Sequence, residues 1–544
     1  MAAAGASASE IRRLAKGTLG FAKLRPGQLQ AIEAVTAGRD TLAVMSTGYG
    51  KSAIYQLAGE LLDGPTIVVS PLIALQRDQV EAMEEAAPGE AAELNSTIPE
   101  SKRQELMESL REGEREFVLL APEQLAKEEV LEELREAKPS LLVIDEAHCI
   151  SEWGHDFRPD YLRLGTFAAE LGHPTLLALT ATASPPVRRE IVERLGMEDP
   201  AVFVRGFDRP NLHLAVRRFT EEHGKERALV EAVQAAEKPG IVYIATRRAS
   251  EELAEELREA GVAAEAYHAG LGSRRRGELQ DAFMEDEIEA IVATTAFGMG
   301  IDKPNVRFVF HAGLSDSVDS YYQEVGRAGR DGEPAHACVF YRPEDQGIRR
   351  FLGAGGGVDA EQLEEVAKTV AEEGEVDPAE LAEEVDLSRS KVLEAVSRLE
   401  EVGFLDVSED GDVVQRDDAP PLEAAIEEGA EASEEREEFE KSRLEMMRSY
   451  AEHSGCRRDF VLSYFGEEHD PPCGNCDNCD AGLVESEADV ERPFEIGTPV
   501  THSEWGQGEV QRYDANRVVV LFESVGYRTL DLDLVEEKGL LEAT

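Results

Sequence analysis

The sequence has little positive charge for its length, and lysine is much scarcer than arginine. Its 544 residues include 56 Lys and Arg against 111 Asp and Glu, which gives a formal net charge of −55. This balance argues against a protein that coats nucleic acid or an anionic membrane by bulk charge. Local basic clefts remain compatible with it, because exposed charges more than ~8 Å apart are largely screened at physiological salt.

Cysteines and long apolar runs are also few. Six cysteines are too few for a disulfide scaffold, and no run of ~18 apolar residues is present to cross a membrane. The N-terminal residues MAAAGASASE lack the charged-then-apolar order of a signal peptide. A hydrophobic fraction of 42% excludes global disorder, and ~150 residues per domain suggest about three to four domains. We expect a soluble, intracellular, multidomain protein.

Short apolar runs alternate with helical patterns from about residue 40 to 340. In the first half the runs are Thr41–Met45, Thr66–Ser70, Phe117–Leu120, Leu141–Asp145 and Leu176–Thr180. After Asp208 they are Gly240–Ala245, Ala290–Thr294, Val306–His311 and Ala337–Tyr341. Strands separated by helices in this way predict an α/β protein with two doubly wound parallel-sheet domains, joined by residues 206–210.

The character of the chain changes after Tyr341. Residues 358–416 carry three helical patterns, with Ser388 suited to cap the third, and then two short apolar runs around an Asp-Gly turn. This order predicts a winged-helix-like region, with a plain helical linker domain as the alternative. The Glu-dense residues 421–440 predict a solvated helix. Residues 496–540 predict a small SH3- or Tudor-like β-barrel, either a partner-binding module or a stabilising cap.

The segment Met45–Ser52 predicts a phosphate-binding loop between a strand and a helix. Its glycines let the loop curl so that backbone N–H groups face phosphate at the positive end of the helix dipole. Lys51 is expected to reach the β- and γ-phosphates, and the Ser52 hydroxyl to bind Mg²⁺. Met45 stands where this pattern usually has glycine, so the motif alone is moderately specific. The nucleotide-binding residues predicted here are Thr47, Gly48, Gly50, Lys51 and Ser52.

Two acidic residues, Asp145 and Glu146, stand at the end of the hydrophobic run Leu141–Asp145. They lie at the carboxyl end of a parallel strand, where such sheets bind their ligands. Asp145 is expected to hold Mg²⁺, directly or through water, and Glu146 to orient and deprotonate the attacking water. The alternative is a solvated turn, which the phosphate loop upstream makes improbable.

A glycine-punctuated motif near residue 327 supplies two arginines at helical i,i+3 spacing. Arg327 and Arg330 could face one cleft and stabilise charge on a transferred phosphoryl group. Exposed arginines paired with nearby carboxylates are the alternative interpretation, which fits two arginines in one such motif poorly.

Aromatic residues gather directly after the acidic pair. Trp153, Phe157 and Tyr161 offer π-faces for bases, and Arg158 offers a cation for phosphate. Because this loop follows Glu146 closely in the sequence, it could signal to the catalytic base that a strand is bound. The alternative is that these aromatic side chains belong to the core, but the glycine, proline and polar residues between them argue against it.

Four of the cysteines form a metal-binding pattern. Three of them lie in a tight C-x-x-C-x-x-C run, and thiolates in this arrangement fit a closed, structural Zn²⁺ site. The predicted ligands are Cys456, Cys473, Cys476 and Cys479. Disulfides are improbable inside a reducing cell. Cys149 and Cys338 are interpreted as small core residues.

Together these motifs resemble the RecQ family of superfamily 2 DNA helicases, over roughly residues 14–345 and the cysteine cluster. Further segments that carry the resemblance are Phe21–Gln28, Ser70–Gln79, Ala121–Glu123, Ser151–Tyr161, Thr180–Ala183, Tyr267–Gly270 and Thr295–Asp302. The resemblance implies two RecA-like motor domains that bind ATP and Mg²⁺ between them. It also implies 3′-to-5′ translocation on single-stranded DNA and duplex unwinding in DNA repair and recombination.

The resemblance further implies residue roles that spacing alone does not give. It places Arg25 and Gln28 on adenine and Gln323 in the nucleotide site. His148 would link that site to the aromatic loop, or be a structural histidine. Other functions left open are an RNA helicase, a DNA-stimulated translocase, and a strand-annealing protein that does not unwind.

The C-terminal order departs from the family. The winged-helix pattern precedes the zinc cysteines instead of following them, so the strand-separating hairpin cannot be placed by position. The expected domains are motor domains at 10–206 and 207–345, a winged-helix-like domain at 346–420, a helical zinc-binding domain at 421–482, a linker at 483–495 and a β domain at 496–544. The expected partners are single-stranded and forked DNA and a protein bound by the β domain, at the cytoplasmic nucleoid of a bacterial-type cell.

Overall fold

The computed structural model describes residues 5–71, 73–86, 89, 91–95, 98–151, 158–298, 301–345, 358–408, 412–416, 418–467, 469–484, 492–514, 516–522 and 524–543. The chain divides into two compact units. Unit 1 comprises Met1–Arg205 and Gly356–Glu437, and unit 2 comprises Gly206–Gly355 and Glu438–Thr544. Each unit is described by itself.

A parallel sheet of seven strands forms the centre of unit 1, in the order β3-β4-β2-β5-β6-β1-β7. Its strands are β1 (Thr41–Met45), β2 (Thr66–Val69), β3 (Ala91–Leu94), β4 (Phe117–Leu120), β5 (Leu141–Ile144), β6 (Thr175–Thr180) and β7 (Ala201–Arg205). Strands β1, β2, β4 and β5 are buried at every residue. This burial on both faces explains why they were recognisable as continuous apolar runs.

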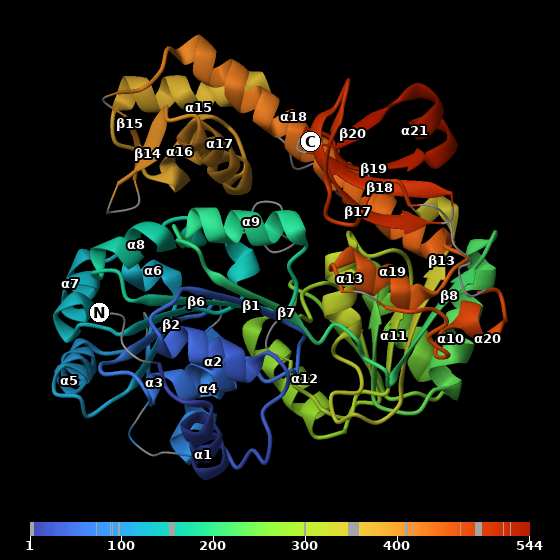
Figure 1. The fold of residues 1–544 in the computed structure, drawn as a ribbon, viewed down its shortest axis with the longest axis horizontal. Helices are drawn as coiled ribbons and strands as arrows, with labels where there is room; N and C mark the ends of the chain where they lie inside the picture. The colour runs from blue at the N-terminus through green and yellow to red at the C-terminus, as the bar shows by residue number, and fades with distance from the viewer. Residues whose placement is uncertain are drawn as a thin grey trace. The chain divides into compact units, whose positions relative to one another are not determined.

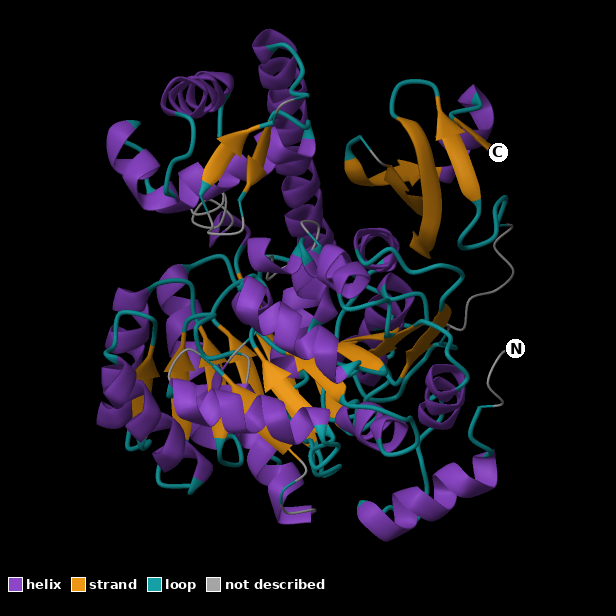
Figure 2. Ribbon diagram, turned by 90° about the vertical axis from the view of Figure 1, so that its left-hand side faces the viewer, coloured by secondary structure: helices purple, strands orange, loops and turns teal. Residues whose placement is uncertain are grey.

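Helices cover both faces of this sheet (Figures 1 and 2). They are α1 (Ala8–Thr18), α2 (Gln28–Thr36), α3 (Ser52–Gly59), α4 (Ile73–Ala86), α5 (Glu100–Arg111), α6 (Pro122–Leu125), α7 (Glu128–Ala137), α8 (Leu164–Glu170) and α9 (Pro185–Arg194), with the 3-10 turns η1 (Ala147–Ile150) and η2 (Pro159–Tyr161). The core between sheet and helices includes Ile32, Ile54 and Leu177.

The second part of unit 1 is a helical region with its own core. It comprises α15 (Ala360–Glu373), α16 (Pro378–Glu384), α17 (Arg389–Glu401) and the antiparallel pair β14 (Leu405–Val407) and β15 (Val413–Gln415). The Ser388 side chain caps α17 by accepting a hydrogen bond from the Lys391 N–H. Leu363, Leu381 and Leu399 are fully buried in its core. The predicted three helices and hairpin are therefore present.

Unit 2 is built on a second parallel sheet, in the order β10-β11-β9-β12-β13-β8. Its strands are β8 (Leu212–Arg218), β9 (Gly240–Tyr243), β10 (Ala264–Tyr267), β11 (Ala290–Ala293), β12 (Phe308–His311) and β13 (Ala335–Tyr341). Its helices are α10 (Glu222–Ala235), α11 (Arg247–Glu259), α12 (Ser273–Met284), α13 (Val318–Val325) and the 3-10 turn η3 (Pro343–Asp345). The two predicted parallel-sheet domains are thus confirmed.

The long helix α18 (Leu422–Glu452) leads to the cysteine cluster, where α19 (Arg457–Tyr464) and α20 (Asp477–Asp480) follow. The chain ends in an antiparallel sheet of five strands, in the order β19-β18-β17-β16-β20. Its elements are β16 (Pro499–His502), β17 (Gly506–Asp514), β18 (Arg517–Phe522), β19 (Gly526–Asp531), α21 (Leu532–Lys538) and β20 (Leu541–Ala543). This sheet agrees with the predicted small β domain.

Within the described parts of the two parallel sheets, four strands have no counterpart among the predicted runs: β3, β7, β8 and β10. Each is the outermost strand of its sheet, so no further strand of the sheet pairs with its outer side, and several of its residues are partly exposed. Edge strands tolerate polar residues for this reason, and the apolar signal is lost. Among the described residues, none of the helices combines the length and apolar character needed to span a bilayer.

Candidate nucleotide-binding and hydrolysis site

The loop between β1 and α3 curls around two glycines. Gly48 and Gly50 have left-handed φ angles of 75° and 85°, a region that L side chains rarely adopt. A Cβ at residue 50 would lie 2.9 Å from Gln28 Nε2. Lys51 Nζ donates a hydrogen bond to the Met45 carbonyl at 3.1 Å, and Ser52 begins helix α3. The loop therefore presents an ammonium group and a helix N-terminus together.

The segment before α2 holds this loop. Gln28 is buried, and its Nε2 donates to the carbonyls of Tyr49 and Gly50 at 3.1 and 2.9 Å. Arg25 Nη1 donates to the Gly48 carbonyl at 2.7 Å, and its guanidinium carbon lies 5.2 Å from the centroid of the Tyr49 ring. The two residues predicted to contact adenine thus lie directly against the phosphate loop.

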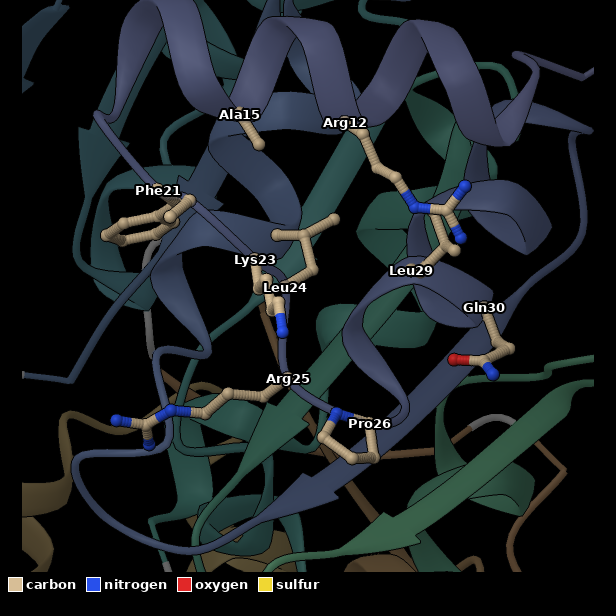
Figure 3. Close-up of a pocket in the computed structure, with 10 residues that line it drawn as sticks. Arg12, Ala15, Phe21, Lys23, Leu24, Arg25, Pro26, Leu29 and Gln30 are labelled. Atoms are coloured by element: carbon tan, nitrogen blue, oxygen red, sulfur yellow. The ribbon is translucent and has the colours of Figure 1, made fainter.

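A pocket of about 500 Å³ lies beside Arg25. Figure 3 shows Arg12 and Ala15 extending from helix α1 on one side, and Arg25 and Pro26 on the loop at the other. Phe21 lines the pocket and is 41% exposed. An exposed aromatic ring among basic side chains suits a purine base. Phe21 begins the segment Phe21–Gln28 that carries the family resemblance, but only Arg25 and Gln28 of that segment were predicted to contact adenine.

The acidic pair follows β5. Asp145 is 6% exposed, and its Oδ2 accepts a hydrogen bond from Gln79 Nε2 at 3.2 Å. Burial and the neighbouring Glu146 carboxylate raise the pKa of Asp145 to about 6, although Lys51 opposes the shift. The Lys51 ammonium is thus close enough to Asp145 to favour its ionised form. Gln79, which ends the segment Ser70–Gln79 that carries the family resemblance, is therefore a neighbour of the carboxylate predicted to bind Mg²⁺.

Glu146 has backbone angles that are unusual for a residue with a side chain. Its φ of 48° and ψ of 45° are left-handed, a conformation that costs free energy and is retained where the surroundings enforce it. The Asp145 carboxylate accepts a hydrogen bond from the Glu146 N–H at 3.0 Å. Asp145 and Glu146 are thereby fixed as a unit at the carboxyl edge of the sheet.

His148 lies directly behind the acidic pair and is fully buried. Its Nδ1 is 2.8 Å from the hydroxyl of Thr180, at the end of β6, and 3.4 Å from Glu146 Oε2. Arg158, a predicted phosphate-binding residue, donates from Nη1 to the Pro71 carbonyl at 2.6 Å. His148 thus connects the candidate base to a second segment of the motor sheet.

One prediction for the aromatic loop is wrong. Tyr161 was expected to offer a face for bases, but it is fully buried, and its hydroxyl donates to the Asp145 carbonyl at 3.1 Å. It is a core residue that supports the acidic pair, because the turn η2 directs it inward. Trp153 and Phe157 lie outside the described residues.

The arginine motif of unit 2 follows helix α13. Arg327 is 4% exposed, and Arg330 forms an ion pair with Asp302. The buried Nε atoms of both arginines have no hydrogen-bond partner among the described residues. Gln323 lies on α13 and is partly buried. Two cations are thus held in place with donor capacity remaining, which suits an anionic ligand.

Two residues missed from the sequence fix the turn that carries these arginines. Arg209 donates to the carbonyls of Gly326, Ala328 and Gly329 at 3.2, 2.7 and 3.0 Å. Asn211 Nδ2 donates to the Gly329 carbonyl at 2.8 Å. Both lie at or just after the connector at 206–210, where charged and amide residues beside a proline were the available signal.

The four predicted zinc ligands come together in unit 2. The Sγ atoms of Cys456, Cys473, Cys476 and Cys479 lie within 4.8 Å of one another. Four thiolates at this spacing fit tetrahedral Zn²⁺ without an open position, which makes the site structural. The module is tied to the motor sheet, because the Asp477 carboxylate accepts a hydrogen bond from the Val216 N–H at 2.9 Å.

Comparisons with protein families match four stretches of the chain. Residues 25–190 match the DEAD/DEAH box helicases, and residues 224–332 match the helicase conserved C-terminal domain. Residues 416–480 match the RecQ zinc-binding family. Residues 497–538 match a family described as a protein of unknown function (DUF3553).

Among curated proteins, the probable ATP-dependent DNA helicase RecS of Bacillus subtilis is 34% identical over 477 residues, which are 87% of this chain and 92% of that protein. The ATP-dependent DNA helicase RecQ of Pasteurella multocida is 34% identical over 487 residues, 88% of this chain and 64% of that protein. The chain thus covers nearly all of one relative and somewhat less than two thirds of the other.

Among solved structures, the helicase Lhr of Mycobacterium smegmatis bound to ssDNA and AMP-PNP has a TM-score of 0.51 at 21% identity, covering 78% of this chain and 62% of that chain. The helicase MrfA bound to DNA has a TM-score of 0.52 at 16% identity, covering 78% and 64%. At these identities the two structures show a shared fold.

Proposed function

This chain belongs to the RecQ family of ATP-dependent DNA helicases, and on that premise we propose how its residues use ATP to separate DNA strands. The protein couples ATP hydrolysis to 3′-to-5′ movement along single-stranded DNA and to duplex unwinding in repair and recombination. The observation that carries this function is the convergence of Lys51, Asp145 and Glu146 at the carboxyl edge of the unit 1 sheet. Ligands of open parallel sheets bind at that edge.

The residues of unit 1 bind the nucleotide and activate water. The loop N–H groups of residues 47–50 and Lys51 hold the phosphates, while Ser52 and Asp145 hold Mg²⁺. Mg²⁺, when bound, neutralises charge on the β- and γ-phosphates. Glu146 accepts the proton of the attacking water. Adenine is bound by Arg25 and Phe21, which line the pocket of Figure 3, and by Gln28, which contacts the phosphate loop.

The arginine motif of unit 2 completes the chemistry. Arg327 and Arg330 stabilise negative charge on the transferred phosphoryl group, and Gln323 belongs to the nucleotide site. Their burial supports these roles, because a buried guanidinium interacts more strongly with developing charge than a solvated one. Arg209 and Asn211 act as positioning residues for this motif.

The loop after the acidic pair couples DNA to hydrolysis. Trp153 and Phe157 stack on bases, and Arg158 binds phosphate. His148 then signals to Glu146 that a DNA strand is bound. The position of His148 between Glu146 and Thr180 supports this coupling. The protein acts on DNA at the nucleoid. The C-terminal β domain binds a protein partner through the part of its surface that does not pack on helices α18 and α19.

The test is ATP-dependent unwinding of a 3′-tailed against a 5′-tailed DNA duplex, with Lys51→Ala as the inactive control. Unwinding of the 3′-tailed duplex alone is the expected result. Unwinding of the 5′-tailed duplex alone would reverse the proposed polarity. An RNA duplex unwound in preference to DNA would favour the RNA helicase function.

A second candidate function is a DNA-stimulated translocase or strand-annealing protein that does not unwind. It is favoured by one observation: within the described stretches after Cys479, a β domain follows the zinc module where the family resemblance implies a winged helix. DNA-stimulated ATP hydrolysis without strand separation on either tailed duplex would establish it.

A further inference from the structure

Helix α13, which leads into the arginine motif, is held at its N-terminus by buried polar side chains of the zinc module. Asp319 is 3% exposed, and its carboxylate accepts a hydrogen bond from the hydroxyl of Tyr464 on α19. Arg443 on α18 donates to the Ser317 hydroxyl at 2.9 Å and lies 3.5 Å from the Asp319 carboxylate. A charge-assisted network in such a dry setting fixes its members closely.

The middle of α13 is held by the same module. The hydroxyls of Tyr321 on α13 and Tyr450 on α18 are 2.9 Å apart and buried. The ring of Tyr322 lies 5.0 Å from that of Phe465. A cavity lined by Tyr321 and Tyr322 has a volume of only about 20 Å³. Close packing of this kind transmits displacement instead of absorbing it.

The C-terminal β domain, which comprises β16 to β20 and α21, packs on helices α18 and α19. The Tyr527 N–H donates to the hydroxyl of Ser442 at 3.0 Å, one residue before Arg443. The Tyr527 ring lies 5.6 Å from the ring of Tyr464, the residue that binds Asp319. Arg528 pairs with Glu438 at 3.1 Å, and the Arg512 guanidinium lies 3.6 Å from the Phe460 ring centroid.

One glycine allows this close approach. Gly526 has a φ of 67°, and a Cβ there would lie 2.2 Å from Ser442 Oγ and 3.0 Å from the Phe439 ring. Gly539, in the same domain, has a φ of 59°, and no atom of the described residues lies within 4 Å of the position that a Cβ would take. A side chain at residue 526 would therefore meet helix α18, whereas one at residue 539 would meet only the strain of the left-handed backbone.

We propose that the C-terminal β domain is a positioning module for ATP hydrolysis, which holds the arginine motif in place through Ser442, Arg443, Tyr464 and Asp319. Tyr464 and Asp319 are positioning residues, because they act through α13 and are not among the residues assigned to the nucleotide site. The inference rests on the hydrolytic role proposed for Arg327 and Arg330. Displacement of a catalytic group by ~1 Å can cost about 10²-fold in rate, so even partial loosening of α13 should be measurable.

The test compares Gly526→Ala with Gly539→Ala in the full-length, zinc-loaded protein. Both variants add the same methyl group at a left-handed glycine, and only the first meets Ser442. We expect Gly526→Ala to lower kcat for DNA-stimulated ATP hydrolysis about tenfold, with unchanged Kd for a fluorescent ADP analogue and for single-stranded DNA. Amide hydrogen exchange in residues 317–330 should rise in Gly526→Ala alone. Equal kcat and equal exchange in the two variants would overturn the proposal.

A second variant, Tyr464→Phe, keeps the ring packing and removes only the hydroxyl bonded to Asp319. It should reproduce the loss of kcat at full zinc content, and an unchanged kcat would contradict the network even if Gly526→Ala misfolds. A wild-type protein without DNA-stimulated hydrolysis would instead disprove the proposed function. The exchange of residues 317–330 then still decides whether the β domain holds α13.

Discussion

The phosphate loop of unit 1 and the arginine motif of unit 2 are held in place in different ways. The loop is supported by near neighbours in sequence, since Arg25 and Gln28 contact it across 23 and 22 residues. The arginine motif depends on distant ones: Arg209 contacts Ala328 across 119 residues, and Tyr464 contacts Asp319 across 145. The phosphate loop is thus supported from a nearby stretch of chain, whereas the arginine motif and helix α13 are supported by residues more than a hundred positions away, one of them in the zinc module.

Removing a zinc ligand should produce the largest difference between the effects on unit 2 and the effects on unit 1. Cys476→Ser should lose Zn²⁺, because it removes one of the four clustered thiols. The module should then loosen, because metal binding to such modules supplies ~10 kcal/mol or more of folding free energy. Hydrogen exchange should rise in α13 and β8, while unit 1 still binds a fluorescent ADP analogue. Cys338→Ser, a buried cysteine outside the cluster, should keep its zinc. Loss of nucleotide binding in Cys476→Ser would contradict the separation.

Arg327→Ala tests the unit 2 half directly. We expect kcat to fall about 10³-fold, as on removal of an arginine that stabilises phosphoryl transfer, with little change in the Kd of ADP. Steady-state hydrolysis with saturating single-stranded DNA gives the first quantity and fluorescence titration the second. The exposed Arg274→Ala is the control. A parallel loss of ADP binding would assign Arg327 to ground-state binding instead.

Lys51→Ala tests the unit 1 half. Loss of the ammonium at the phosphates should lower kcat about 10²- to 10³-fold and, unlike Arg327→Ala, should also weaken ATP binding. The exposed Lys102→Ala should leave both unchanged. If the two catalytic variants gave the same kcat and Kd pattern, the contrast between the halves would not extend to their chemistry.

The raised pKa of Asp145 predicts a pH dependence for unit 1. Burial and Glu146 raise this pKa to about 6, so the carboxyl is increasingly protonated below pH 6 and ionised above it. Protons then compete with Mg²⁺, and the apparent Mg²⁺ affinity should fall about tenfold per pH unit below 6. Titration of Mg²⁺ into the protein–ADP mixture between pH 5 and 8 measures this. Affinity independent of pH across that range would exclude Asp145 as a ligand.

The smallest expected effect is at the adenine pocket. Phe21→Ala removes the exposed ring, and stacking worth ~1 kcal/mol corresponds to about a fivefold higher KM for ATP. kcat should not change, because the base is remote from the reacting phosphate. Phe21→Tyr should restore the KM. A kcat effect without a KM effect would remove Phe21 from the adenine site.

The fold class and the residues of the phosphate loop were readable from the sequence because their signals are local. Buried central strands are continuous apolar runs, and a phosphate loop needs glycines at fixed spacing beside Lys51. The same reasoning missed the edge strands β3, β7, β8 and β10, whose one-sided exposure permits polar residues. It also misjudged Tyr161, because aromatic composition does not reveal whether a ring faces solvent or the core.

By itself, the sequence determined the two parallel sheets and the four-cysteine cluster, and it supplied the residues proposed to bind the nucleotide, because each is specified within a short segment. Only the tertiary structure decided that Gln79 adjoins Asp145, that Arg209 holds the arginine turn, and that the β domain packs on the helices that hold α13. These contacts join residues far apart in the chain. Their partners become neighbours only when burial of apolar surface brings the segments together.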